Sequence, residues 1–259
     1  MISDTSWPGY QRAPQDVIDG YATVVGEVTD LIDAGGLPEP DVIAAQIGVG
    51  GFAAAVARGF AHRPNRLMVG AEPLDAACVT ASAAAGHIVS LEGEQHSAMA
   101  GLNCGTPSDL AWPDVSSGFD AFSVIDDAAA EQAMRLLASD GIAAGESGAA
   151  GLAGLLGNLG ELGLTSDDTV LVFLTEGPTD SANYRRVVGG NQAGSHQRCQ
   201  QGDGARGVAA GVGDAGGVLH GFQLARAQLG EAIDPVGGGA VGRRSGSGAR
   251  RRPTRLCIY

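Results

Sequence analysis

Short apolar runs alternate with longer helical patterns along the first part of the chain. This alternation is the signature of strands that are joined by crossover helices in a parallel sheet. We therefore predict an α/β fold for residues 1–188. The expected helices are 14–32, 52–61, 75–85, 127–138 and 147–162, and the expected strands are 42–46, 67–71, 87–91, 122–125 and 169–174.

The composition changes sharply near Gly189. Residues 1–188 hold 25 acidic side chains and 7 arginines, whereas residues 189–259 hold 4 acidic side chains, 9 arginines and 18 of the 42 glycines. We expect this Gly/Ala/Arg-rich, low-complexity tail to be disordered, and one hypothesis is that it is translated out of frame. Its arginines are spread too thinly to favour a nucleic-acid-binding arm.

The chain shows none of the common signs of export, membrane insertion or metal binding. No stretch approaches the roughly 20 apolar residues that a membrane-spanning helix needs, and the first residues do not resemble a signal peptide. The four cysteines lack C-x-x-C spacing, so no metal site is expected. We expect a cytoplasmic protein in which Cys78 and Cys104 are buried free thiols rather than a disulfide.

The sharpest local motif is a glycine-rich turn between an expected strand and an expected helix. It comprises Gly48, Val49, Gly50 and Gly51. Glycine allows a tight turn and close approach of a ligand, and the free N–H groups at the start of a helix attract anions. The turn therefore predicts a phosphate site, although such turns also occur for purely structural reasons.

The same turn also fits a dinucleotide-binding pattern. Gly48, Gly50 and Ala53 match G-x-G-x-x-A, and Glu72 ends the next expected strand, where it could hold ribose hydroxyls. Against this alternative, the unit does not open the chain, and Pro73 immediately follows the glutamate. The rest of the sequence has to decide between the two interpretations.

Several segments match one family in order, over roughly residues 3–188. The chain resembles the diaminopropionate ammonia-lyases, fold-type-II pyridoxal-phosphate enzymes related to threonine dehydratase and the tryptophan synthase β chain. The matching segments are Asp4–Tyr10, Gly48–Gly51, Val69–Pro73, Met99–Gly105, Gly145–Leu152 and Thr175–Asp180.

The resemblance implies pyridoxal phosphate as cofactor, a small amino acid as substrate and a homodimer, with no nucleic-acid or membrane partner. Gly48–Gly51 would cradle the cofactor phosphate, and Thr175 would face the pyridine nitrogen. Asp4 would assist proton transfer, a role in which partial burial tunes a carboxylate. Glu146 would either lie near the cofactor or simply interact with a helix dipole. The implied reaction is β-elimination of 2,3-diaminopropionate to pyruvate and ammonia.

One required residue type is absent, because all 16 basic Lys or Arg residues are arginines. Enzymes of this family join a lysine amine to the cofactor aldehyde, and arginine cannot replace it because the guanidinium stays protonated. The family places this lysine in an N-terminal stretch that precedes the matching part. We therefore expect a truncated lyase domain with exposed apolar edges that is inactive alone, or a remnant without catalysis.

Overall fold

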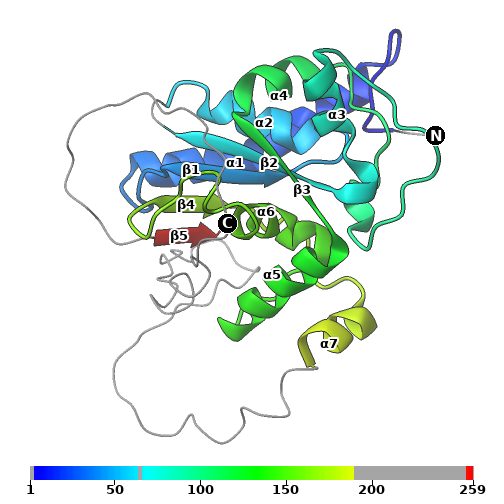
Figure 1. Ribbon diagram of the computed structural model, residues 1–259. Helices are drawn as coiled ribbons and strands as arrows, with labels where there is room; N and C mark the ends of the chain where they lie inside the picture. The colour runs from blue at the N-terminus through cyan, green and yellow to red at the C-terminus, as the bar shows by residue number, and fades with distance from the viewer. Residues whose placement is uncertain (1–2, 64–65, 190–254, 259) are drawn as a thin grey trace, which may run out of the picture.

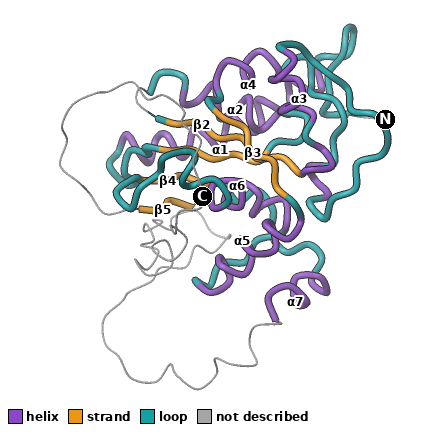
Figure 2. Tube along the Cα trace, viewed as in Figure 1, coloured by secondary structure: helices purple, strands orange, loops and turns teal. Residues whose placement is uncertain are grey.

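The computed structural model describes residues 3–63, 66–189 and 255–258. Its centre is a five-stranded sheet in which all neighbouring strands are parallel, in the order β3-β2-β1-β4-β5 (Figures 1 and 2). The strands are β1 Val42–Gln46, β2 Leu67–Pro73, β3 Ala121–Ile125, β4 Thr169–Val172 and β5 Arg255–Ile258.

Helices cover both faces of the sheet, as the apolar runs of the sequence predict (Figure 1). Helices α1, α2 and α4 pack together on one face, and α5, α6 and α7 pack together on the other. The helices are α1 Arg12–Asp33, α2 Gly51–Phe60, α3 Cys78–Ala85, α4 Trp112–Gly118, α5 Asp127–Ser139, α6 Glu146–Leu156 and α7 Ser181–Gly189, with short 3-10 helices η1 Leu74–Ala76 and η2 Ala100–Leu102.

Strand β1 shows why the sheet needs two covering layers. All five of its residues are buried. Because neighbouring side chains point to opposite faces, Ile43 and Ala45 join the core beneath α1 and α2, whereas Val42 and Ala44 join the core beneath α5 and α6. The structure thus confirms the α/β fold with a parallel sheet, and it places β1 at its predicted bounds.

The predicted strand at 87–91 is wrong. These residues form a loop in which Val89 N–H donates to Ser82 Oγ and Leu91 N–H donates to the Gly105 carbonyl. None of them is buried, so they lack the environment that a strand of a parallel sheet requires. The apolar side chains of this segment are partly buried in a loop, and its backbone does not pair with a described strand of the sheet.

Two predicted helices also differ from the observed ones. The helix expected at 75–85 is split at Ala77, which leaves η1 and α3. The helix expected at 147–162 ends at Leu156, and turns follow from Gly157. Helices α4 and α7 were not predicted from the sequence.

Most of the expected disordered tail lies outside the described residues. At its two ends, Gly189 closes α7 and Arg255–Ile258 form β5 beside β4. In these four residues the chain is therefore a strand rather than disordered. None of the described helices is long and apolar enough to cross a membrane.

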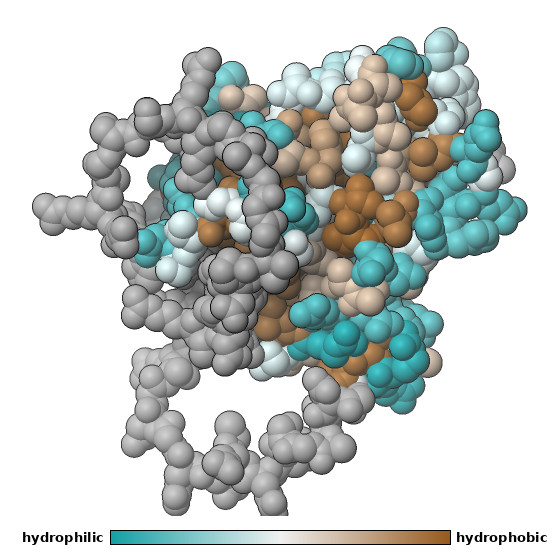
Figure 3. Space-filling view, viewed as in Figure 1, coloured by the Kyte–Doolittle hydropathy of each residue, from teal (hydrophilic) through white to brown (hydrophobic). Residues whose placement is uncertain are grey.

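Some large apolar side chains lie exposed at the edge that β3 forms. Leu74 and Val124 are 65% and 38% exposed. Figure 3 shows apolar side chains gathered on the face turned to the viewer, in the region where β3 lies in Figure 1. Strand β3 ends the sheet on this side.

Candidate functional site

A pocket of about 200 Å³ lies where β1 and β4 end, and six of the site residues predicted from the sequence line it. Carboxyl ends of parallel strands are the usual ligand-binding edge of open α/β sheets. The predicted residues that line it are Asp4, Gly48, Val49, Gly50, Gly51 and Thr175. Residues far apart in the chain are thus brought to one cavity.

The glycine turn forms the floor of this pocket between β1 and α2. Gly50 caps α2 in the left-handed conformation, with φ at 101°, which glycine adopts readily. A β-carbon on Gly48 would lie 3.1 Å from Cys104 Sγ, and one on Gly50 would lie 3.1 Å from Ala111 Cβ. The turn therefore leaves little room for side chains and exposes its backbone to the pocket.

Backbone N–H groups at the start of α2 supply the electrostatics of the site. Within the described residues, the first turn of α2 from Gly51 to Ala53 has no carbonyl acceptor for its N–H groups, as at any helix start. The positive end of the helix dipole acts at the same place. Together they form an anion site suited to a phosphate group.

A second helix, α6, also begins at the pocket. Ser147 in its first turn lines the cavity, and its Oγ accepts a hydrogen bond from Gly101 N–H at 3.1 Å. Gly148 allows the segment after β4 to pass close by, because a β-carbon there would lie 2.4 Å from the Glu176 carbonyl oxygen. Glu146 does not line the pocket and instead accepts a hydrogen bond from Asn183 Nδ2.

Thr175 has a partner that the sequence reasoning missed. The side chain of Gln46 lines the pocket, and its Nε2 donates to Thr175 Oγ1 at 2.5 Å. Gln46 is only 3% exposed. The signal in the sequence was a lone amide at the end of an otherwise apolar strand, directly before the glycine-rich turn, since buried polar groups are costly unless they are hydrogen-bonded.

Asp4 reaches the pocket because the N-terminal segment is anchored at Ser6. Ser6 N–H donates to Ser108 Oγ at 2.9 Å, and Leu110 N–H donates to Ser6 Oγ at 2.7 Å. The rings of Trp7 and Tyr10 stack with centroids 4.4 Å apart. These contacts fix the segment that carries Asp4.

The dinucleotide alternative requires a free Glu72, and the structure does not provide one. Glu72 is fully buried, and its carboxylate accepts hydrogen bonds from the N–H groups of Val79 and Thr80 and from Thr80 Oγ1. Burial raises the pKa of this carboxyl group. The side chain serves the start of α3 and is not available to ribose hydroxyls.

Cys78 and Cys104 are free thiols, as expected, but only Cys78 is buried, whereas Cys104 is partly exposed. Burial, with a smaller effect of the Glu72 carboxylate, raises the pKa of Cys78 to about 12. Burial, with a smaller effect of Asp4, raises the pKa of Cys104 to about 11. Among the described residues, no group of His, Cys, Asp or Glu is placed to hold a metal ion.

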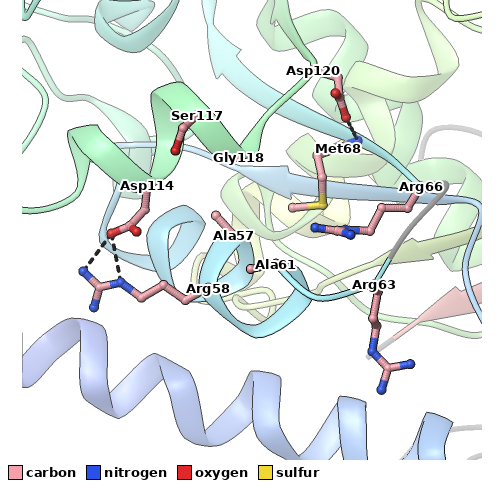
Figure 4. A pocket seen from close by; sticks show the side chains of 10 residues that line it. All are labelled: Ala57, Arg58, Ala61, Arg63, Arg66, Met68, Asp114, Ser117, Gly118 and Asp120. Carbon is pink, nitrogen blue, oxygen red and sulfur yellow. Dashed lines mark hydrogen bonds and ion pairs between the residues drawn. The ribbon is translucent and has the colours of Figure 1, made fainter.

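A larger pocket, of about 530 Å³, lies near the start of β2, where Arg66 and Met68 line it (Figure 4). It is a poorer candidate because most of its charged side chains have protein partners, although Nε of Arg66 has none among the described residues. Arg58 Nη2 lies 2.7 Å from Asp114 Oδ2, and Asp120 Oδ2 accepts a hydrogen bond from Met68 N–H. Burial lowers the pKa of Arg66, whose side chain also points into this pocket.

The sheet, the glycine-rich turn and the pocket fit the fold-type-II class of pyridoxal-phosphate enzymes, and the comparisons with known proteins show this class. Residues 7–176 match the family model described as pyridoxal-phosphate dependent enzyme, and the chain belongs to this family. Diaminopropionate ammonia-lyase of Escherichia coli (strain K12) is 34% identical over 206 residues, which cover 73% of this chain and 51% of that protein.

Solved structures agree with this assignment. E. coli diaminopropionate ammonia-lyase in complex with an aminoacrylate-PLP azomethine reaction intermediate matches with a TM-score of 0.65 and 32% identity, covering 74% of this chain and 52% of that one. Maize serine racemase matches with a TM-score of 0.56 and 30% identity, covering 65% of this chain and 52% of that one. The chain spans about half the length of the curated E. coli relative that it matches.

Proposed function

We propose that this chain supplies the cofactor-binding part of a lyase that converts 2,3-diaminopropionate to pyruvate and ammonia. The observation that supports the proposal is that Asp4, Thr175 and the turn Gly48–Gly51 converge on one pocket at the start of α2. The similarity to diaminopropionate ammonia-lyases supports this choice of substrate.

Each side chain has a definite task in this proposal. The turn Gly48–Gly51 and the free N–H groups of α2 bind the phosphate. The hydroxyl group of Thr175 hydrogen-bonds to the ring nitrogen, and the carboxylate of Asp4 moves a proton at the substrate. Bound pyridoxal phosphate supplies an electron sink for the charge that develops at the substrate α-carbon.

The absence of lysine limits what these 259 residues do alone. The covalent bond to the cofactor aldehyde needs a side-chain amine, and arginine does not provide one at neutral pH. We therefore propose that this chain binds pyridoxal phosphate without a covalent bond, and that catalysis needs a lysine from another polypeptide segment.

The same observation favours a second candidate function, a phosphate-binding module without catalysis. The two candidates share the pocket and differ in whether a lysine reaches it. To distinguish the two candidate functions, the lysine-bearing half of the E. coli relative is produced separately and added to this chain. Restored release of pyruvate from 2,3-diaminopropionate supports the lyase, whereas a binding pocket that stays inactive supports the module.

The direct test is titration of the chain with pyridoxal phosphate, followed by borohydride reduction and peptide mass spectrometry. We expect saturable binding with no reduced adduct at an internal side chain. The variant Gly50→Val should abolish binding, because Gly50 combines a φ of 101° with a neighbour 3.1 Å from the added carbon.

The matched control is Gly86→Val, which introduces the same side chain at a φ of 75° where nothing lies within 4 Å of the added β-carbon. It carries a similar backbone strain away from the pocket, so binding should persist. A stoichiometric adduct at a defined internal residue, or unchanged binding in Gly50→Val, contradicts the proposal.

The proposal keeps two further expectations from the sequence, a homodimer and a cytoplasmic location. Light scattering coupled to size-exclusion chromatography tests the first, with a mass of twice 25.9 kDa expected. Fractionation of source cells tests the second.

A further inference from the structure

Gln46 is an unusual residue for its position. It ends β1, all of whose residues are buried, and it lies directly before Ile47 and the glycine-rich turn. Burying a primary amide costs free energy unless its hydrogen bonds are made. Strand β1 could end with an apolar residue at this position, so the amide calls for an explanation.

The amide is aimed at one specific group. Gln46 and Thr175 are 129 residues apart in the chain, and the parallel pairing of β1 with β4 brings them together. Nε2 of Gln46 lies 2.5 Å from Oγ1 of Thr175, and both residues line the pocket.

The direction of this hydrogen bond determines what Thr175 offers to a ligand. A hydroxyl group has one proton and two acceptor sites. Because the Gln46 amide donates to Oγ1, the oxygen uses an acceptor site for Gln46 and keeps its proton for a ligand acceptor in the pocket.

The other half of the amide supports this direction. Oε1 of Gln46 is buried and has no hydrogen-bond partner among the described residues. It faces Gly151, where even a β-carbon would lie 3.3 Å away. If the amide were rotated, Nε2 would take this place, and buried donors without a partner are rarer than buried acceptors without one.

We infer that Gln46 is a positioning residue that fixes Thr175 as a hydrogen-bond donor to the ring nitrogen of pyridoxal phosphate. The inference rests on the proposed function, because it requires the cofactor ring in this pocket. A nitrogen that accepts from Thr175 has its lone pair occupied and stays unprotonated. The bound ring is then a weaker electron sink, which suits β-elimination.

The variant Gln46→Glu tests the inference because it is nearly isosteric and reverses the bond. An ionised carboxylate can only accept hydrogen bonds, so the Thr175 hydroxyl would donate its hydrogen bond to the new carboxylate of the variant Gln46→Glu. A lone pair of the hydroxyl oxygen would then face the ring nitrogen. That nitrogen should then bind a proton. Because burial raises the pKa of a carboxyl group and rising pH also removes a proton from the ring nitrogen, the variant and the unchanged chain are compared at each pH of a titration.

The readout is the ¹⁵N chemical shift of the ring nitrogen in labelled pyridoxal phosphate bound to the full chain. We expect the unprotonated signal in the unchanged chain and a shift to the protonated signal in Gln46→Glu. The control is Gln132→Glu, the same change at an exposed position on α5, which should leave the signal unchanged.

A merely structural role for Gln46 would alter affinity or folding without moving this signal. If circular dichroism shows that Gln46→Glu is unfolded, Thr175→Ala at the exposed pocket rim takes its place. Loss of the donor should move the signal toward that of free, unprotonated pyridine, and no movement overturns the inference.

The role of Gln46 and the binding of the cofactor are contradicted by different results. A protonated nitrogen in the unchanged chain, or an unmoved signal in folded Gln46→Glu, overturns the role of Gln46 while cofactor binding stands. If the unchanged chain gives no bound signal at all, the proposed function fails, and this inference fails with it.

Discussion

The carboxylate of Glu72 accepts two hydrogen bonds from Thr80, one from the backbone N–H at 2.7 Å and one from Oγ1 at 2.6 Å. A third comes from Val79 N–H at 2.8 Å. This carboxylate at the end of β2 therefore caps the start of α3. The chain leaves the helical conformation at Ala77, directly before this capped turn.

The buried Glu72 carboxyl group should make stability depend on pH. Its pKa in the folded state is raised above the ordinary value of 4.5, mainly by burial. The folded protein therefore binds this proton more tightly than the unfolded chain, and the free energy of unfolding falls as pH rises from 4.5 through the folded pKa. Urea unfolding of Glu72→Gln across this range should show a weaker fall.

The same variant should also be less stable at low pH, by about 1–3 kcal/mol, because the amide cannot accept all three hydrogen bonds. Glu92→Gln, at an exposed loop position, is the control and should change neither quantity. An unchanged pH slope in Glu72→Gln would assign the pH dependence to other groups.

Gly148→Ala should disturb the wall of the pocket. The added carbon would lie 2.4 Å from the Glu176 carbonyl oxygen, so the segment after β4 has to move. We expect a loss of about 1–3 kcal/mol in the free energy of unfolding and weaker binding of pyridoxal phosphate, since Thr175 precedes Glu176. Chemical unfolding and a cofactor titration measure the two effects.

Gly160→Ala is the matched control, because nothing lies within 4 Å of the added carbon. Equal effects of the two variants would show that the close approach at Glu176 is not limiting.

The thiols of Cys78 and Cys104 should react slowly with alkylating reagents. With pKa values of about 12 for Cys78 and about 11 for Cys104, both thiols stay protonated near neutrality. The thiolate is the nucleophile, so the rate should rise roughly ten-fold for each unit of pH below these values. Peptide mass spectrometry after iodoacetamide treatment measures each site, and fast modification at about pH 7 would contradict the burial.

Local patterns predicted the parts of the fold that local chemistry determines. The apolar run Val42–Gln46 ends at a glycine-rich turn, which marks a buried strand followed by a helix, and the structure has both there. The predicted strand at 87–91 failed because short apolar runs also occur in partly packed loops. Helix α7 has few apolar residues, so periodicity gave no sign of it.

The site was predictable in its parts but not in its contacts. The glycine-rich turn predicts an anion site from its local sequence alone. The hydrogen bond between Gln46 and Thr175 depends on which strands are neighbours, and that pairing joins segments 129 residues apart. Resemblance to a family selected Thr175 and Asp4, whereas only the structure shows that both line the same cavity.

Asp4→Asn should strengthen the binding of pyridoxal phosphate to this chain. Asp4 lines the same pocket as the glycine-rich turn, so its negative charge opposes that of the phosphate. Removing a repulsion between partly solvated charges contributes up to about 1 kcal/mol, which corresponds to roughly a five-fold tighter dissociation constant. Asp30→Asn makes the same charge change at an exposed position near the end of α1 and should leave affinity unchanged. The gain should also shrink at high salt, because partly solvated charges are screened. Weaker binding in Asp4→Asn would mean that the carboxylate holds the cofactor instead of opposing it.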